Sequence, residues 1–337
     1  MRGLKATVLK LDFNYKLASK IRVWDGQGRS FKPYVCIITV LNEFAQTVFW
    51  KAYRTHESMG GEVIEDMHKL NHRLMRNART NTSPILAVWS DKCCQWRKKL
   101  QEVFTNAEVK LDIFHWERRW DPLLLDTNSR EAQLFRSLTR RALFFVDKEE
   151  YAAQKCRLRE AKGREPLPKE IIARCRTMVF KPEELARNFR AVLQYCFLSD
   201  AKTDVELASG ATNGGVTSDN LLQPRRIFKQ ITPKLRQLIA NQMRHIEGGC
   251  LSDPEKLSAH FLNPRTKKWF CIRSTSHCET DNQYLDLLTG KSIGIERADR
   301  LLNDYFEASN DRKRIHRQGE EDYGTNRTEI LMFMRGK

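Results

Sequence analysis

The chain has 337 residues, enough for one large domain or two ordinary ones with a substantial core. It carries 59 Lys and Arg residues against 42 Asp and Glu residues, a formal net charge of +17. This excess favours a polyanion as the partner, because Lys and Arg neutralise phosphates and release counterions, with an anionic membrane surface as the alternative. No run of 18 apolar residues, lipidation motif, signal peptide or Cys-x-x-Cys pair occurs. We therefore expect a soluble, intracellular protein with reduced cysteines and no zinc knuckle.

The first part of the chain carries the short apolar and alternating segments that are typical of strands. We predict strands at 5–13, 20–25, 34–41 and 47–53. The second of them ends in Asp25-Gly-Gln-Gly28, which is turn chemistry. Short connections between successive strands favour antiparallel pairing.

Helical and strand-like segments then alternate up to His115. Ser58 is the predicted N-cap of a helix in which Val63, Met67, Leu70 and Leu74 recur at helical spacing. An apolar strand at 84–89, a basic helix at 93–104 and a second apolar strand at 109–114 follow. An antiparallel opening followed by alternating helix and strand predicts an α/β fold of the ribonuclease-H-like type, with a mixed sheet flanked by helices.

The sequence changes in character after His115. Residues 129–200 are predicted to be helical, basic and free of strands, and 200–220 form a linker of small residues. Residues 221–246 contain six Lys or Arg and no acid, and 279–309 form a last helical block. We expect a first part of the core at 1–120, a large basic all-α insertion at 121–270, C-terminal core helices at 271–310 and a charged tail at 311–337.

Two aspartates stand next to each other in the predicted topology. Asp12 lies in the first strand between Leu11 and Phe13, where a carboxylate is disfavoured unless it is paired or binds a cation. Asp91 lies at the C-terminal end of the strand at 84–89, after Ser90. A solvent-facing Asp12 and a helix N-cap at Asp91 are the alternatives. Adjacent strands would bring the two carboxylates together, in an arrangement that can hold two Mg²⁺ ions about 4 Å apart.

Several short motifs in this order resemble those of eukaryotic DDE transposases with a ribonuclease-H-like core. They are Asp12 within Leu-Asp-Phe-Asn-Tyr-Lys-Leu, Asp91 with its basic helix, and Asp112-x-x-His115. Their spacing is similar to that of the Kyakuja-Dileera-Zisupton and Mutator-like groups. The segment Arg273-Ser-Thr-Ser-His-Cys-Glu-Thr-Asp-Asn-Gln-Tyr-Leu is similar to the family pattern Arg-Gly-Thr-Ser-x-x-Glu-x-x-His-x-x-Leu. The resemblance covers residues 5–310.

The resemblance implies a catalytic domain that cleaves DNA strands and transfers them. Asp12, Asp91 and Glu279 would be its three carboxylates, holding two Mg²⁺ or Mn²⁺ ions, with Asp112 and His115 in support. Double-stranded DNA, both transposon end and target, would be the partner, with no membrane involved. A homo-oligomer is also implied, and the basic composition separately leads us to expect a nuclear location.

Two residues depart from the family pattern, and two other functions stay open. Ser274 replaces a glycine and Asn282 replaces a histidine, as in a domesticated, catalytically silent protein that only binds DNA. A ribonuclease-H-fold nuclease is the other alternative. Exonucleases of that fold usually need Asp-x-Glu in the first strand, and Asn14 stands at the second acidic position.

The assignment of Glu279 as the third carboxylate depends on the resemblance, because the sequence alone offers other acidic residues. Glu117, Asp121 and Glu131 follow the last core strand more closely than Glu279 does. Glu131 on a helix after a short loop would suit an uninterrupted fold of this type.

Basic and aromatic residues supply candidates for DNA contacts. Arg118 and Arg119 could hold phosphate or face solvent. Two roles are open for the side chains of Trp96, Trp116, Trp120 and Trp269. They could stack on an extruded base or pack in the hydrophobic core, and we predict that three of the four are core residues. The best candidates for a DNA-facing surface lack acidic neighbours in sequence, and we expect weak, salt-sensitive binding through them: Arg225, Arg226, Lys229, Lys234 and Arg236.

Overall fold

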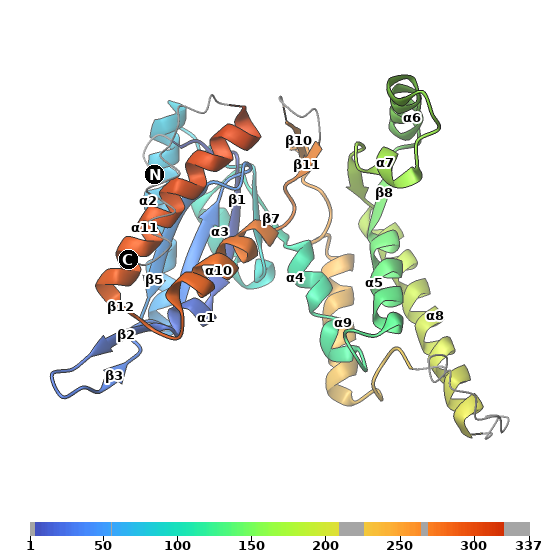
Figure 1. Ribbon diagram of the computed structural model, residues 1–337, viewed down its shortest axis with the longest axis horizontal. Coiled ribbons are helices and arrows are strands. Elements are labelled where there is room, and N and C mark those ends of the chain that lie inside the picture. Colours follow the sequence, from blue (N-terminus) through green and yellow to red (C-terminus); the bar gives the residue numbers. More distant parts are fainter. Residues whose placement is uncertain (1–3, 55, 209–225, 264–268, 320–337) are drawn as a thin grey trace. The chain divides into compact units, whose positions relative to one another are not determined.

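A five-stranded mixed sheet forms the centre of the larger of two units. The computed structural model describes residues 4–54, 56–208, 226–263 and 269–319 (Figure 1). Contacts within the chain divide it into a first unit, Met1–Asp112 with Pro254–Lys337, and a second unit, Ile113–Asp253. The division thus falls before the predicted boundary at 120, and the chain returns to the first unit before 270.

The sheet has the strand order β5-β4-β1-β6-β7. Three strands form the antiparallel part: β1 (Val8–Asn14), β4 (Cys36–Leu41) and β5 (Thr47–Tyr53). Two more continue it in parallel beside β1: β6 (Ala87–Ser90) and β7 (Glu108–Leu111). The prediction of a mixed sheet flanked by helices is confirmed, and β1 is its central strand.

Alternation along β1 gives the sheet one apolar face and one face with charges. Leu9, Leu11 and Phe13 are buried on the apolar side. Helices α2 (His56–Ala78) and α3 (Cys93–Val103) lie on this side of the sheet. There the ring of Phe13 stacks on Trp96 of α3, with ring centroids 5.9 Å apart. The four residues that predicted the helical spacing of α2 are all buried: Val63, Met67, Leu70 and Leu74.

Two C-terminal helices cover the other face of the sheet (Figure 1). They are α10 (Ser276–Thr289) and α11 (Ile295–Lys313), so the single helical block predicted at 279–309 is two helices. Leu285 of α10 and Phe306 of α11 share a buried cluster with Ile37 of β4. The first unit therefore takes its sheet from the beginning of the chain and this helical layer from the end.

Smaller elements complete the first unit. A short helix α1 (Tyr15–Ala18) follows β1. The predicted strand at 20–25 forms as β2 (Ile21–Trp24), but it pairs outside the main sheet. Its partners are β3 (Ser30–Phe31) and β12 (Ile293–Gly294), and another pair comprises β10 (His260–Leu262) and β11 (Trp269–Cys271). The π-helical turn Arg314–Gln318 extends α11.

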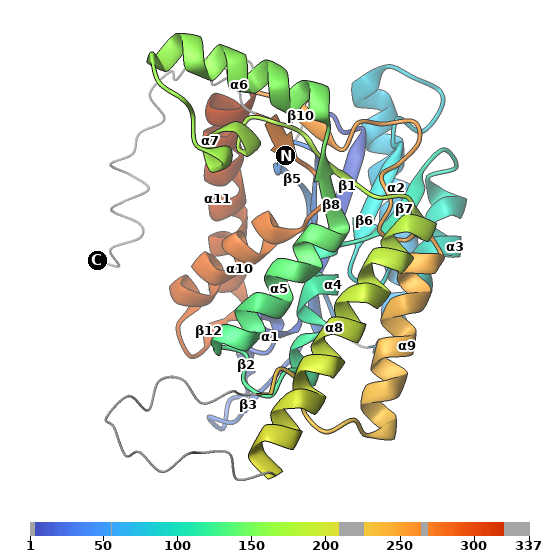
Figure 2. The same ribbon diagram turned by 90° about the vertical axis from the view of Figure 1, so that its right-hand side faces the viewer.

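The second unit is mainly helical and contains one small sheet. Its aromatic core includes Trp116, Trp120 and Phe189, whose rings lie within 5.6 Å of one another by centroid. The prediction that this region lacks strands is wrong, because β8 (Phe144–Val146) pairs with β9 (Thr177–Val179). Figure 2 shows its helices: α4 (Ile113–Arg118), the 3-10 turn Asp121–Leu123, α5 (Arg130–Leu143), α6 (Lys148–Lys162), α7 (Pro168–Ile172), α8 (Pro182–Ala208) and α9 (Pro233–Glu247).

Two further predictions need correction. The strand predicted at 109–114 ends at Leu111, and α4 begins at Ile113. Within the predicted linker at 200–220, α8 continues to Ala208, while 209–220 lie outside the described residues. Among the helices that the structure describes, each is too short or too polar to span a bilayer.

Asn310 of α11 closes the contact between this helix and β5. Its side-chain oxygen accepts from the Thr47 amide at 2.6 Å, and its Nδ2 donates to the Thr47 carbonyl at 2.9 Å. We predict that Asn310→Ala lowers the free energy of unfolding by about 2–3 kcal/mol, because two buried backbone groups lose their partner. Chemical denaturation measures this loss. Exposed Asn303→Ala on the same helix is the control, and an equal effect of both substitutions would contradict the prediction.

Candidate functional site

Three aspartates lie side by side at one edge of the sheet. Strand register pairs Leu11 of β1 with Ser90 of β6, and Ser90 with Leu111 of β7. Because all three strands run in parallel, the next residue of each lies at the same level, still within β1 but just past the ends of β6 and β7. These next residues are Asp12, Asp91 and Asp112.

Asp12 is buried on the charged face of the central strand, only 3% exposed. The alternative of a solvent-facing aspartate is therefore wrong. Its Oδ2 accepts a hydrogen bond of 2.7 Å from Nδ2 of Asn282 on α10. Carboxylate oxygens of Asp12 and Glu279, which lies one turn earlier on α10, come within 4.8 Å of each other. Two carboxylates from opposite ends of the chain thus meet inside the first unit.

Asp112 anchors the helix that carries Glu279. It is fully buried, and its Oδ2 accepts from the backbone amide of Thr275 at 2.9 Å and also from the Thr275 hydroxyl. Thr275 is the N-cap residue of α10. A carboxylate at a helix start satisfies free amide groups and is favoured by the helix dipole. Asp112 therefore fixes where α10 begins.

Asp91 is half-buried at the end of β6. Its Oδ1 accepts a long hydrogen bond, 3.5 Å, from the Ser90 hydroxyl. The N-cap of α3 is Lys92 and not Asp91, so the helix-cap alternative is wrong. Burial raises the pKa of the Cys36 thiol to about 12; Lys92 opposes this shift, and the charges of Asp12 and Asp91 add to it. Both carboxylates thus act on one thiol.

The predicted supporting pair is divided between the two units. Asp112 ends the sheet of the first unit, whereas His115 lies half-buried on α4 of the second. The ring of His115 meets Phe114 edge-on, with centroids 5.6 Å apart. His115 therefore lies within a helix, and not directly after a strand that ends at 114 as we predicted.

The competing third carboxylates all lie in the second unit. Glu117 and Asp121 form ion pairs with arginines of α5, at 3.2 and 2.7 Å. Glu131 stands in the first turn of α5. Within the first unit, Glu279 is the acidic side chain that the structure brings to Asp12.

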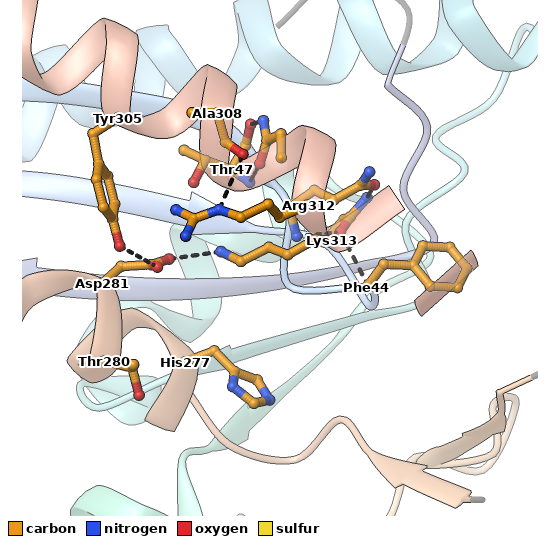
Figure 3. A network of polar contacts seen from close by, with 12 residues as sticks. Phe44, Thr47, His277, Thr280, Asp281, Tyr305, Ala308, Arg312 and Lys313 are labelled. Atoms are coloured by element: carbon orange, nitrogen blue, oxygen red, sulfur yellow. Dashed lines mark hydrogen bonds and ion pairs between the residues drawn. The ribbon is translucent and has the colours of Figure 1, made fainter. Parts of the chain in front are cut away.

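A network of polar contacts holds α10 against α11 (Figure 3). Asp281 follows Glu279 by two residues and is 5% exposed. Its carboxylate accepts from the Tyr305 hydroxyl at 2.9 Å and from Lys313 Nζ at 2.8 Å. Sequence reasoning missed this network, because a buried aspartate in a helix gives no signal without its partners.

Positive charges are also buried on the charged face of the sheet. Lys10, two residues before Asp12, is fully buried, and its Nζ has no hydrogen-bond partner among the described residues. Burial lowers the pKa of Lys10 to about 8, and Arg317 contributes in the same direction. Burial and the charges of Arg317, Lys10 and Lys313 lower the pKa of His277 to about 3. His277 is therefore neutral at physiological pH.

The basic residues predicted to contact DNA differ in their surroundings. Arg225 lies outside the described residues. Arg226 forms an ion pair of 3.0 Å with Asp204, an acid that is distant in sequence. Lys229 is exposed and donates to the carbonyl of Pro122 at 3.1 Å. Lys234 and Arg236 are exposed on α9. They are therefore the remaining candidates for contacts with DNA phosphates.

The other residues considered for nucleic-acid contacts come from both units. Arg118 is exposed and lies 4.7 Å from the centroid of Phe114, whereas Arg119 contacts His245 at 3.3 Å. A hollow of about 550 Å³ beside α5, which sequence reasoning missed, is lined by Arg140, Arg141 and Phe144 among others. Of the four tryptophans, three are buried and Trp269 is half-buried, as predicted: Trp96, Trp116 and Trp120 are core.

Each unit also carries one pair of soft metal ligands. In the first, Cys93 and Cys94 have Sγ atoms 3.6 Å apart at the start of α3. In the second, His245 and Cys250 have ligand atoms within 4.8 Å near the end of α9. Neither pair has the Cys-x-x-Cys spacing that a sequence search uses.

No protein-family model, curated protein or solved structure matches this chain. The function of the site therefore has to be inferred from its residues.

The burial of Lys10 predicts a specific pH dependence of stability. Its folded pKa of about 8 lies below the ordinary value of 10.5. Below pH 8 the side chain is charged in both states and the burial penalty is complete. Between pH 8 and 10.5 only the unfolded chain keeps the proton, so stability rises by about 3 kcal/mol.

We predict that Lys10→Met is more stable than wild type at pH 7 and that this advantage disappears by about pH 10.5. Denaturant unfolding at a series of pH values measures the difference between the two proteins. Exposed Lys98→Met on α3 serves as the control. A Lys10→Met protein that is less stable than wild type at pH 7 would show that the charge has a partner.

Proposed function

We propose that this protein cleaves DNA strands and transfers them to new positions in a metal-dependent reaction. Asp12, Asp91 and Glu279 are the proposed catalytic carboxylates. The observation that carries the proposal is the approach of Glu279 to the buried carboxylate of Asp12, within 4.8 Å. Two carboxylates so close together repel each other unless a cation or a proton is shared between them.

The order of the sheet supports this proposal. Three antiparallel strands followed by two parallel strands, with the aspartate on the central strand, are what we expect of a ribonuclease-H-like core. Residues 113–253, which form the second unit, separate the last strand from the helix of Glu279. This division agrees with a core interrupted by a large insertion, as the resemblance to DDE transposases implies.

The side chains of the site fit hard divalent cations. Carboxylate oxygens are the ligands that Mg²⁺ and Mn²⁺ prefer, and Asp12 presents its carboxylate inside the first unit, only 3% exposed. We propose that Asp12, Asp91 and Glu279 hold two such ions. When bound, a pair of ions activates the attacking water or 3′-hydroxyl and stabilises the leaving oxygen.

The surrounding residues fix the geometry of the carboxylates. Asn282 donates a hydrogen bond to Oδ2 of Asp12 and so helps to orient that carboxylate. Asp112 fixes the start of α10, and Asp281 fixes the same helix against α11. Glu279 lies between these two anchors, so its backbone is held on both sides.

A DNA-binding protein without catalytic activity is the second candidate. The bond from Asn282 to Asp12 favours it, because an amide now occupies an oxygen of a proposed metal ligand. The nuclease alternative has less support. Asn14 stands where a second acid would be needed, and its side chain caps α1 by accepting from the Leu17 amide at 2.7 Å.

Double-stranded DNA is the partner that we propose, in keeping with the net charge of +17. A nuclear location and a homo-oligomeric assembly belong to the same proposal.

The first test is nicking and strand transfer of double-stranded DNA in Mg²⁺ or Mn²⁺. We expect Asp91→Asn and Glu279→Gln to lower the rate by about a hundredfold or more, because each removes a carboxylate that would hold the ions. Glu131→Gln is the matched control and should retain activity. Loss of activity in Glu131→Gln with activity retained in Glu279→Gln would move the third carboxylate to Glu131, and an inactive wild type that binds DNA would favour the silent protein.

The second test concerns the exposed basic residues of α9. We predict that replacing Lys234 and Arg236 together by Ala weakens DNA binding and reduces the slope of log K against log salt by about 1–2. Fluorescence anisotropy at a series of salt concentrations measures both effects. The matched control replaces Arg157 and Arg159, which are exposed on α6 with the same spacing. Equal losses in both double variants would show only a general effect of net charge.

A further inference from the structure

Two consecutive cysteines begin the helix that follows Asp91. Cys93 is fully buried and Cys94 is exposed, and both are thiols that are not joined in a disulfide. Their Sγ atoms are 3.6 Å apart. Consecutive side chains on a helix point about 100° away from each other, so this approach requires both to turn toward a common point.

The geometry of the pair does not suit a disulfide. Neighbouring Cα atoms are about 3.8 Å apart, whereas a disulfide usually needs a separation of about 4.4–6.8 Å between them. The pair therefore stays a dithiol unless the backbone distorts.

The same geometry suits a tetrahedral metal ion. Zn–S bonds of about 2.3 Å at a tetrahedral angle place two sulfurs about 3.8 Å apart. The observed 3.6 Å is close to this value, so one ion can bind both thiolates with little movement. Exposure of Cys94 gives the ion a path from solvent.

We propose that Cys93 and Cys94 bind one soft divalent cation, with Zn²⁺ as the physiological ion. Each thiol loses its proton when it binds, so two S–H bonds are replaced by two Zn–S bonds and two protons enter solvent. Ligands outside this pair fill the remaining coordination positions. This site is distinct from the proposed carboxylate site, because thiolates select soft ions and carboxylates select hard ones.

The position of the thiol pair gives the ion a structural consequence. Cys93 lies two residues after Asp91, and only Lys92 separates them. An ion on the first turn of α3 therefore fixes the segment that leads out of β6, where Asp91 stands. Its binding and its test do not depend on whether the protein cleaves DNA.

The test is a titration of the full chain with Cd²⁺, which reports thiolate ligands by its sulfur-to-metal charge-transfer absorption. We expect one equivalent to bind to wild type. Cys94→Ser should lower the affinity at least about a hundredfold, and Cys156→Ser should leave it unchanged. Cys94 is exposed, so its replacement spares the core, and Cys156 is a matched exposed cysteine on α6.

A second measurement keeps the result independent of folding. Calorimetry with Zn²⁺ in buffers of different ionisation heat counts the released protons, and we expect two from this pair. Full absorption in the Cys94→Ser protein, equal loss in the Cys156→Ser protein, or no binding to wild type would overturn the proposal.

Discussion

The hydrogen bonds between Asp112 and Thr275 join two segments that are 163 positions apart in sequence. Asp112 directly follows the last strand of the sheet, and Thr275 is the N-cap of the helix that covers the charged face. A buried carboxylate is costly unless charge-assisted hydrogen bonds compensate, and the free amides of a helix start are well suited to this. Glu279 and Asn282 follow on the next turns, so their approach to Asp12 depends on this anchor.

The charged face combines opposite charges at a cost in stability. The side chains of Lys10 and Asp12 lie on the same face of β1. Lys10 Nζ has no hydrogen-bond partner among the described residues, whereas Asp12 accepts a hydrogen bond from the amide of Asn282. Hydrophobic side chains at these two positions would fill the layer between the sheet and the helices without the free-energy cost of burying charges. Buried charges that reduce stability are typical of sites retained for chemistry, which is consistent with the function that we propose.

The sequence was most informative where a pattern extends over several residues. The strand at 47–53 matches β5, and the apolar pattern at 5–13 located the strand that carries Asp12, which forms as β1. The end of β7 was missed because Asp112 bonds to a residue that no local pattern reveals. Strands β8 and β9 are three residues each, too short for a period-two signal. Glu279 came from the resemblance, since its partner lies at the other end of the chain.

The divided first unit has a consequence for the order in which the protein folds. By the time a ribosome has made Asp112, all five strands of the sheet exist, but α10 and α11 do not. The sheet face with Lys10 and Asp12 stays uncovered until the whole second unit has been synthesised, because α10 and α11 follow it in the chain. The second unit can form its own core in the meantime. Contacts of such long sequence separation close slowly. An incomplete chain thus carries an uncovered sheet, and this is the stage at which it is most exposed to aggregation and to chaperones.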